Sequence, residues 1–118
     1  MKKIYHLATC STCQRIIKEL GINQDNFEMQ DIKSQPMTFE QIDEMAAFGL
    51  SFEDLFSKRA MKYKSLGLKE KNLSEQDFRQ LIQEEYTFLK RPVIIIDDEI
   101  FIGNSKKTVA AIAEKLND

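Results

Sequence analysis

The feature that most constrains the fold is a change of hydrophobic period around two cysteines near the start of the chain. Residues 3–7 form a short apolar run without Gly or Pro, which predicts a β-strand. The next apolar residues recur at the spacing of one helix face: Cys13, Ile16, Ile17 and Leu20. Gly21 is expected to end this helix as a left-handed cap residue, and residues 26–32 predict a second strand. The chain therefore opens as strand, helix, strand, with Cys10 and Cys13 at the strand-to-helix turn.

Residues 36–88 are expected to be mainly helical. Thr38 and Ser74 each begin a capping-box pattern, and Ser51 begins a shorter helical piece. The run 58–66 is predicted to continue as a helix up to the glycine that follows it. We therefore expect three or four helices here, as an insertion between the second and third strands.

Two strands and one helix complete the pattern. Residues 93–96 form a β-branched run, an acidic turn follows, and residues 100–102 form a second strand that ends at a glycine. Ser105 caps a final helix with a single apolar stripe, formed by Val109, Ile112, Ala113 and Leu116. The order βαβ, helices, ββα predicts an α/β fold around a four-stranded mixed sheet.

The composition is that of one globular domain covering residues 1–118. Charged residues make up 31% of the chain and apolar residues 42%, and the net charge of -2 comes from 17 basic and 19 acidic residues mixed along its length. We therefore expect no direct nucleic-acid binding. The sequence shows neither the ~18 apolar residues of a membrane span nor the core of a signal peptide. These observations predict a monomeric cytoplasmic protein without membrane contact.

The position of the cysteine pair predicts two different roles. Cys10 is expected at or just before the first helical residue, where free backbone N–H groups and the helix dipole stabilise a thiolate. Cys13, one turn later, belongs to the inward stripe and should be less ionised, but near enough to attack a mixed disulfide on Cys10. Cys10 is thus the expected nucleophile and Cys13 the resolving thiol. Two inert buried thiols remain the alternative, because free cysteine is among the most buried residue types.

A zinc site is not expected. Zinc takes about four ligands, and His6 is the only other soft candidate, which leaves the set one short. His6 lies on the first strand, so we favour a hydrogen-bonded structural histidine over a catalytic one. We therefore expect no bound metal and no bound cofactor.

Several motifs together resemble a known family. With the CxxC at a strand-to-helix junction and Arg91-Pro92 ahead of a strand, the chain resembles the thioredoxin superfamily. The segments "FSKRAMKYKSLGL" and "LKRPVII", the helical insertion and the length are similar to the glutaredoxin-coupled arsenate reductase family, which also contains the Spx-type transcription regulators. The similarity covers essentially the entire chain. It implies a thioredoxin/glutaredoxin-like fold: one domain over 1–118, with residues 36–88 as the insertion.

The resemblance also implies roles for individual residues. Pro92 should be a cis proline whose loop lies against the cysteines, and Arg91 should bind an oxyanion and stabilise the thiolate. Considered without the resemblance, a trans proline at a strand start and a solvated arginine remain open. Arg59 is the expected second arginine of the substrate site, with Ser11 and Thr12 between the cysteines as further substrate contacts.

Two departures from the reductase pattern affect substrate binding. Arg59 is displaced relative to the reductases but aligns with the Spx-type pattern, and Gly103 stands where a third reductase arginine is expected. Each missing charge-assisted hydrogen bond would weaken oxyanion binding by about 1.5–3 kcal/mol. We therefore expect weak arsenate binding, unless a lysine replaces the missing charge: Lys62, Lys106 or Lys107.

Two functions are consistent with these features. The first is an arsenate-reductase-like thiol-disulfide oxidoreductase acting on a small oxyanion or disulfide, with glutathione and glutaredoxin, or thioredoxin, as electron donor. The second is an Spx-like redox-sensing regulator that binds RNA polymerase, because a second cysteine such as Cys13 is typical of the regulators and could form a redox-switch disulfide. The regulators carry a tail after the last helix, whereas this chain ends soon after Leu116, which favours the enzyme. A member with weak generic thiol chemistry and an unknown substrate is the third option.

Overall fold

The computed structural model describes residues 1–117, which form two compact units. The first unit comprises Met1–Gln35 and Arg91–Asp118, and the second comprises Pro36–Lys90. That the whole chain is one domain remains a prediction. None of the helices within residues 1–117 combines the length and apolar character needed to cross a bilayer.

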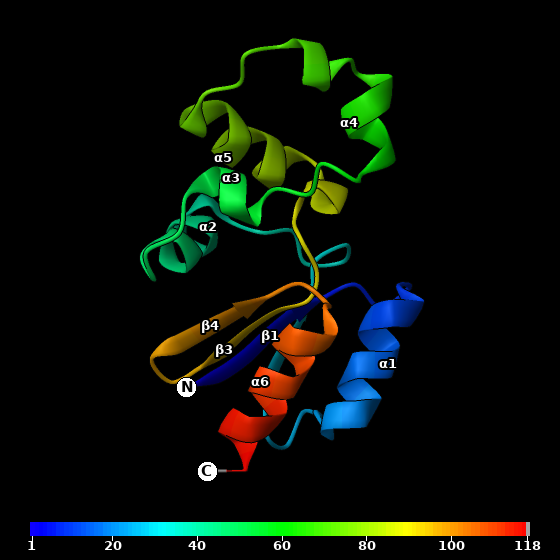
Figure 1. Cartoon of the computed structure of the whole chain (residues 1–118), viewed down its shortest axis with the longest axis vertical. Helices are drawn as coiled ribbons and strands as arrows, with labels where there is room; N and C mark the ends of the chain where they lie inside the picture. Colours follow the sequence, from blue (N-terminus) through cyan, green and yellow to red (C-terminus); the bar gives the residue numbers. More distant parts are fainter. Residues whose placement is uncertain (118) are drawn as a thin grey trace. The chain divides into compact units, whose positions relative to one another are not determined.

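The first unit is built on a four-stranded mixed sheet, as the sequence pattern predicted (Figure 1). Its strands lie in the order β2-β1-β3-β4; β1 pairs with β2 in parallel, and the other two pairings are antiparallel. In chain order the elements are β1 (Lys2–His6), α1 (Ser11–Leu20), β2 (Glu28–Asp31), β3 (Val93–Ile96), β4 (Glu99–Ile102) and α6 (Lys106–Leu116). The parallel β1–α1–β2 unit and the β3–β4 hairpin thus meet where β1 pairs with β3.

Helices α1 and α6 cover one face of this sheet. Ile4 of β1 lies opposite Ile94 of β3, and both side chains are fully buried. They pack in one apolar cluster with residues of both helices, including Ile17 of α1 and Ile112 of α6. Because side chains alternate across a strand, His6 projects from the same face of β1 as Ile4. The C-terminal end of β1 therefore carries a histidine on the face that the helices cover.

The second unit is helical and has an aromatic core. Its elements are α2 (Phe39–Ala46), α3 (Phe52–Leu55), α4 (Met61–Ser65), the 3₁₀ turn η1 (Leu68–Glu70), α5 (Glu75–Glu84) and the 3₁₀ turn η2 (Tyr86–Phe88). The ring of Phe56 is stacked on Phe88 at 4.8 Å between centroids and meets Phe78 edge-on at 5.0 Å. The same ring also contacts the Tyr63 ring edge-on. One phenylalanine thus joins α4, α5 and η2.

One helix prediction in this unit was wrong at its start. Residues 58–66 were expected to be helical, but α4 begins only at Met61. The reason is that Phe56 is paired with Leu89 in an isolated antiparallel bridge, and the N–H of Ser57 donates to the carbonyl of Phe88 at 2.7 Å. This extended pairing uses the backbone that a longer helix would need.

Most other element predictions hold. Gly21 is in the left-handed region, with φ 69°, at the C-terminal end of α1, and the predicted hairpin and final helix are present. The second strand is shorter than predicted, because the side chain of Asn23 accepts from the N–H of Asp25 and holds the residues before β2 in a turn.

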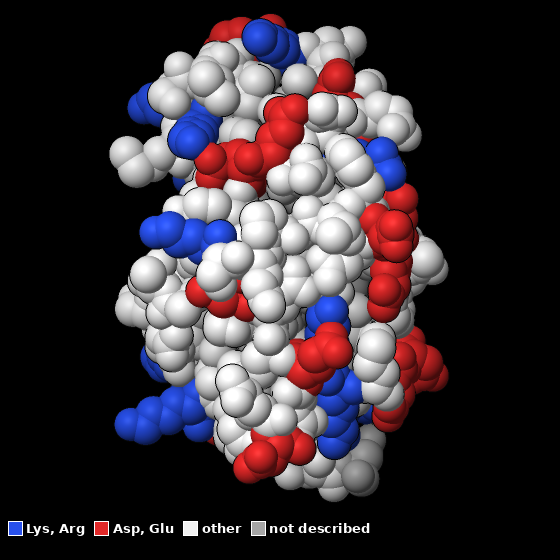
Figure 2. Space-filling model, turned by 180° about the vertical axis from the view of Figure 1, so that it is seen from behind, with Lys and Arg blue, Asp and Glu red and all other residues white. Residues whose placement is uncertain are grey.

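The face of the molecule drawn in Figure 2 carries acidic and basic side chains interspersed with each other.

Candidate active site

The candidate site is the junction between β1 and α1, where Cys10 is the N-cap residue of the helix. Its backbone is extended, with φ -89° and ψ 114°, and its N–H donates to the carbonyl of Leu7 at 3.0 Å. The first turn of α1 contains no acidic residue. An anion at this position therefore meets the N–H groups and the positive end of the helix dipole without a carboxylate in the same turn.

The surroundings of Cys10 favour its thiolate. Burial acts to raise the pKa of this half-buried thiol, but hydrogen bonds from Cys13 and from the backbone of Thr12 outweigh burial, and the charge of Arg91 adds to them. The net result is a pKa below the ordinary value for cysteine. Cys10 is a free thiol, so it can serve as a nucleophile.

Cys13 has the opposite character. Its side chain is fully buried, and this burial is the main reason that its pKa is raised to about 11. The negative charge of Cys10 raises it further, whereas the Leu7 backbone and the charge of Arg91 act to lower it. The pair thus consists of one activated thiol and one protonated thiol within hydrogen-bonding reach of each other.

The charge of Arg91 acts on both members of this pair, and Pro92 follows Arg91 in the chain. The guanidinium of half-buried Arg91 lowers the pKa of both cysteines through its charge. The Arg91–Pro92 peptide bond is cis, the isomer that the family resemblance implied. The loop after β4 holds this dipeptide, because the N–H of Gly103 donates to the carbonyl of Pro92 at 3.0 Å and Asn104 Nδ2 donates to the carbonyl of Arg91 at 3.5 Å.

The other predicted substrate residues are placed as follows. Ser11 is exposed and Thr12 is half-buried, and both lie in the first turn of α1 beside Cys10. Arg59 is exposed and belongs to the other compact unit, in the turn before α4. Its part in a substrate site remains a prediction.

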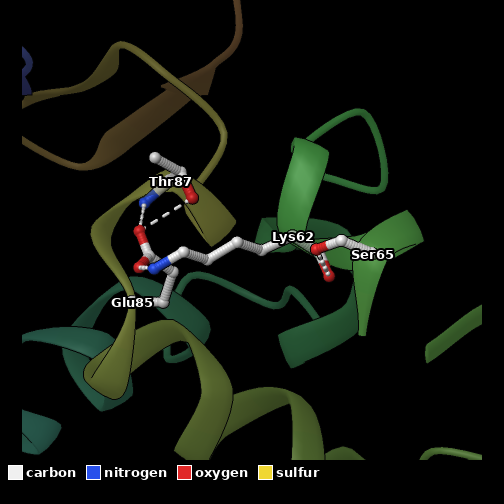
Figure 3. Close-up of polar contacts among 4 residues, drawn as sticks. All are labelled: Lys62, Ser65, Glu85 and Thr87. Atoms are coloured by element: carbon white, nitrogen blue, oxygen red, sulfur yellow. Dashed lines mark hydrogen bonds and ion pairs between the residues drawn. The ribbon is translucent and has the colours of Figure 1, made fainter. Parts of the chain in front are cut away.

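Lys62 is already engaged within its own unit. Its ammonium group lies 2.5 Å from Glu85 Oε1, and Glu85 Oε2 accepts hydrogen bonds from the N–H and the hydroxyl of Thr87 (Figure 3). The hydrogen bond and charge of Glu85 raise the pKa of Lys62. The charge of Lys62 is thus compensated by Glu85, which makes it a poor replacement for a missing arginine.

His6 differs in one respect from what the sequence suggested. Only 8% of the residue is exposed, but Nδ1 is buried without a hydrogen-bond partner among residues 1–117. The description as a hydrogen-bonded histidine therefore fails at this atom. Burial lowers the pKa of His6, and the opposing charge of Asp31, its partner on β2, does not overcome this effect. The imidazole is thus neutral near pH 7.

Three polar residues of the junction were not singled out from the sequence: Gln14, Asp31 and Asn104. Each makes a hydrogen bond from its side chain to the backbone of a loop that carries Cys10 or Arg91. The one usable signal was the position of Gln14 one turn beyond Cys10. Among residues 1–117, no group of three or more His, Cys, Asp or Glu side chains could hold a metal ion.

The sheet, the two helices on one face and the cysteine pair define a thiol protein of the thioredoxin-like class. The chain belongs to the ArsC family, whose model matches residues 5–112. It is 24% identical over 110 residues to the global transcriptional regulator Spx 1 of Bacillus cereus, covering 92% of this chain and 84% of the regulator. It is 28% identical over 102 residues to the uncharacterized protein YusI of Bacillus subtilis, covering 84% of this chain and 86% of that protein.

The fold itself matches that of an arsenate reductase from Vibrio cholerae. The TM-score is 0.78 with 20% sequence identity, over 94% of this chain and 96% of the reductase. This likeness supports the fold alone. The proteins to which the chain is similar thus include a named regulator and, by fold alone, a named reductase.

Proposed function

We propose that the protein is a thiol-disulfide oxidoreductase of the arsenate reductase type, with Cys10 as nucleophile and Cys13 as resolving thiol. The observation that supports it best is a pair of free thiols one helical turn apart whose surroundings lower the pKa of Cys10 and raise that of Cys13. An attacking thiol must be ionised near neutral pH, whereas a resolving thiol must wait until the first step is complete.

With a small disulfide as substrate, the reaction balances over two steps. The Cys10 thiolate attacks one sulfur, forms a mixed disulfide and releases the first thiolate. Cys13 then gives up its proton, which the departing thiolate takes, and attacks the Cys10 sulfur, so that the second thiolate leaves. The protein loses two electrons and becomes a Cys10–Cys13 disulfide. Two glutathione thiols, through glutaredoxin, or a thioredoxin dithiol reduce it back.

Arsenate fits the same scheme. The Cys10 thiolate displaces water from arsenate, and attack by Cys13 on the Cys10 sulfur breaks the sulfur–arsenic bond. The electron pair of that bond passes to arsenic and arsenite leaves. Arg91, with Arg59 as helper and Ser11 and Thr12 in the first turn of the helix, would bind the oxyanion.

The order of the two steps follows from the charges. The anion on Cys10 helps to keep the pKa of Cys13 high, and this contribution ends once Cys10 is bound in a mixed disulfide. Cys13 therefore becomes easier to ionise only after Cys10 has reacted. This order of ionisation limits premature oxidation of Cys13.

The test is turnover of 2-hydroxyethyl disulfide and of arsenate with glutathione and glutaredoxin. Cys10→Ser should abolish both reactions, and Cys13→Ser should accumulate a mixed disulfide on Cys10 that intact-mass spectrometry detects. Undiminished turnover by Cys10→Ser would exclude the proposal. Because Gly103 stands where the reductases have an arginine, we expect the disulfide to be the better substrate.

The second candidate function is that of a redox-sensing regulator, favoured by the likeness to Spx 1 over 92% of the chain. It requires a stable complex with RNA polymerase that changes when Cys10 and Cys13 are oxidised. A pull-down with purified polymerase, using reduced and oxidised protein, separates the two functions. Turnover without a complex supports the enzyme, and a redox-dependent complex without turnover supports the regulator.

A further inference from the structure

The connection between β1 and α1 is held at both backbone polar groups of one residue, Ala8. Its N–H donates to Asp31 Oδ1 at 3.3 Å, and its carbonyl accepts from Gln14 Nε2 at 2.8 Å. The N–H of Cys10 donates to the carbonyl of Leu7 at 3.0 Å, closing the same turn. The residues directly before Cys10 are therefore fixed from β2 on one side and from α1 on the other.

Gln14 contacts the chain on both sides of Cys10. Its side chain bonds Ala8, two residues before the cysteine, and its backbone N–H donates to the carbonyl of Cys10 at 3.0 Å. Gln14 is exposed, so burial of its side chain does not account for this arrangement. The side chain closes a ring of hydrogen bonds around the helix N-terminus.

Asp31 is itself held in place, which makes it a fixed acceptor. Its Oδ1 also accepts from the N–H of Lys33, and its Oδ2 accepts from Ser34 Oγ, each at 3.3 Å. The N–H of Ile32 donates to the carbonyl of His6 at 2.9 Å, which ties the ends of β1 and β2 together. The anchor for Ala8 is therefore part of the sheet.

We propose that Gln14 is a positioning residue: by holding Ala8 against Asp31, it fixes the Cys10 sulfur where the N–H groups of Thr12 and Cys13 stabilise the thiolate. The inference rests on the proposed function of Cys10. Hydrogen bonds weaken steeply as angle and distance depart from their optimum. A turn freed to move would therefore lose part of this stabilisation, although no group that touches the sulfur is removed.

The test is the pH-rate profile for alkylation of Cys10 by iodoacetamide, measured by mass spectrometry. The buffer contains 0.5 M NaCl, which screens the charge that the Gln14→Arg variant introduces. Gln14→Met keeps the length of the side chain and removes the donor. It should raise the apparent pKa of Cys10 that the profile gives, by an amount equivalent to about a two- to tenfold change in the ionisation constant, the effect of one ordinary hydrogen bond. Gln14→Arg keeps N–H donors and should retain the wild-type rate. Gln76→Met, on an exposed position of α5, is the matched control and should change nothing.

The outcomes distinguish this inference from the proposed function. A wild-type Cys10 that titrates like a free cysteine would overturn the proposed function itself. A wild type with a lowered pKa and a folded Gln14→Met with the same profile would overturn only the role of Gln14. Should Gln14→Met fail to fold, Gln14→Leu gives the same reading, because it also lacks the donor and adds no charge.

Discussion

The N-terminus of α1 differs from the N-termini of helices α2, α3 and α5 in the unit Pro36–Lys90. Helices α2, α3 and α5 each begin with a complete capping box, in which Thr38, Ser51 or Ser74 accepts from the backbone three residues later. Each of their first turns also contains at least one acidic residue. Helix α1 has a cysteine at its N-cap and no acidic residue in its first turn, and the N–H groups of that turn face the Cys10 sulfur instead of a capping oxygen.

This difference shows that a helix N-terminus can serve either to stabilise the folded state or to bind an anion. A capping oxygen and a nearby carboxylate satisfy the helix N-terminus and stabilise the folded state. The same groups would occupy or repel an incoming anion. Helix α1 leaves its N–H groups to the Cys10 sulfur, so the reactive junction gives up the stabilising oxygen cap that α2, α3, α5 and α6 have.

The two units also differ in how their cores are built. The cluster beneath α1 and α6 consists mainly of isoleucines brought together by strand pairing, whereas the second unit packs around the ring of Phe56. Strand pairing links residues distant in sequence, and the caps and rings of the second unit act within 55 consecutive residues. The second unit is thus the more local structure.

The largest expected effect tests whether the units lose structure separately. Phe56→Ala removes a ring that is 1% exposed and should destabilise the protein by about 3–5 kcal/mol. Hydrogen exchange with mass spectrometry should show loss of protection in residues 36–90 while β1 and β3 remain protected. Phe27→Ala, in the cluster of the first unit, is the matched control and should give the reverse pattern. Equal loss of protection in all strands and helices would show one cooperative unit instead.

The next effect concerns the two thiols at alkaline pH. The pKa of Cys13 is raised from 9.0 to about 11, so the unfolded chain loses this proton at lower pH than the folded protein does. Stability should therefore fall as the pH rises from 9.0 to about 11. The pKa of Cys10 is lowered, so its contribution has the opposite sign: it is present above 9.0 and disappears as the pH falls through the folded value.

Guanidinium unfolding of the reduced protein between pH 6 and 11 checks these signs. Cys13→Ala should remove the alkaline loss of stability. Cys10→Ala should remove the rise in stability that occurs at lower pH, as the pH increases through the folded pKa of Cys10. Since lysines and tyrosines also titrate in this range, only the differences from wild type are interpreted. An identical pH dependence in wild type and Cys13→Ala would contradict the assignment of a buried, protonated thiol.

Much of the fold could be predicted from local sequence patterns. The change of period at Cys10, the capping boxes and the β-branched run 93–96 each determine local structure through interactions within a few residues. The start of α4 could not be predicted, because it depends on pairing of Phe56 with Leu89, which is distant in sequence. Long-range pairing overrides the helical pattern there.

The features of the site also divide into those that local sequence patterns predict and those that they do not. The helix N-terminus at Cys10 and the burial of Cys13 follow from position in the pattern, and the placement of Arg91 was inferred from a family resemblance. The missing partner of His6 Nδ1 and the bonds of Gln14 and Asp31 to Ala8 are set by side-chain directions in the folded turn. Spacing along the chain carries no information about those directions.

The smallest expected effect tests the comparison of helix N-termini directly. Ser74→Ala removes a hydrogen bond that the Ser74 hydroxyl accepts from the N–H of Asp77 at 3.2 Å, and should destabilise the protein by about 1 kcal/mol. Serine should likewise stabilise the protein more than alanine does at the N-cap of α1. Cys10→Ser should therefore be more stable than Cys10→Ala by about 1 kcal/mol. Both Cys10 variants lack the nucleophile, so this gain is separate from reactivity. Urea unfolding at pH 7 measures both differences. If Cys10→Ser is no more stable than Cys10→Ala, the N–H groups of α1 are not available to an acceptor at this position, and the low pKa of Cys10 must come mainly from Arg91.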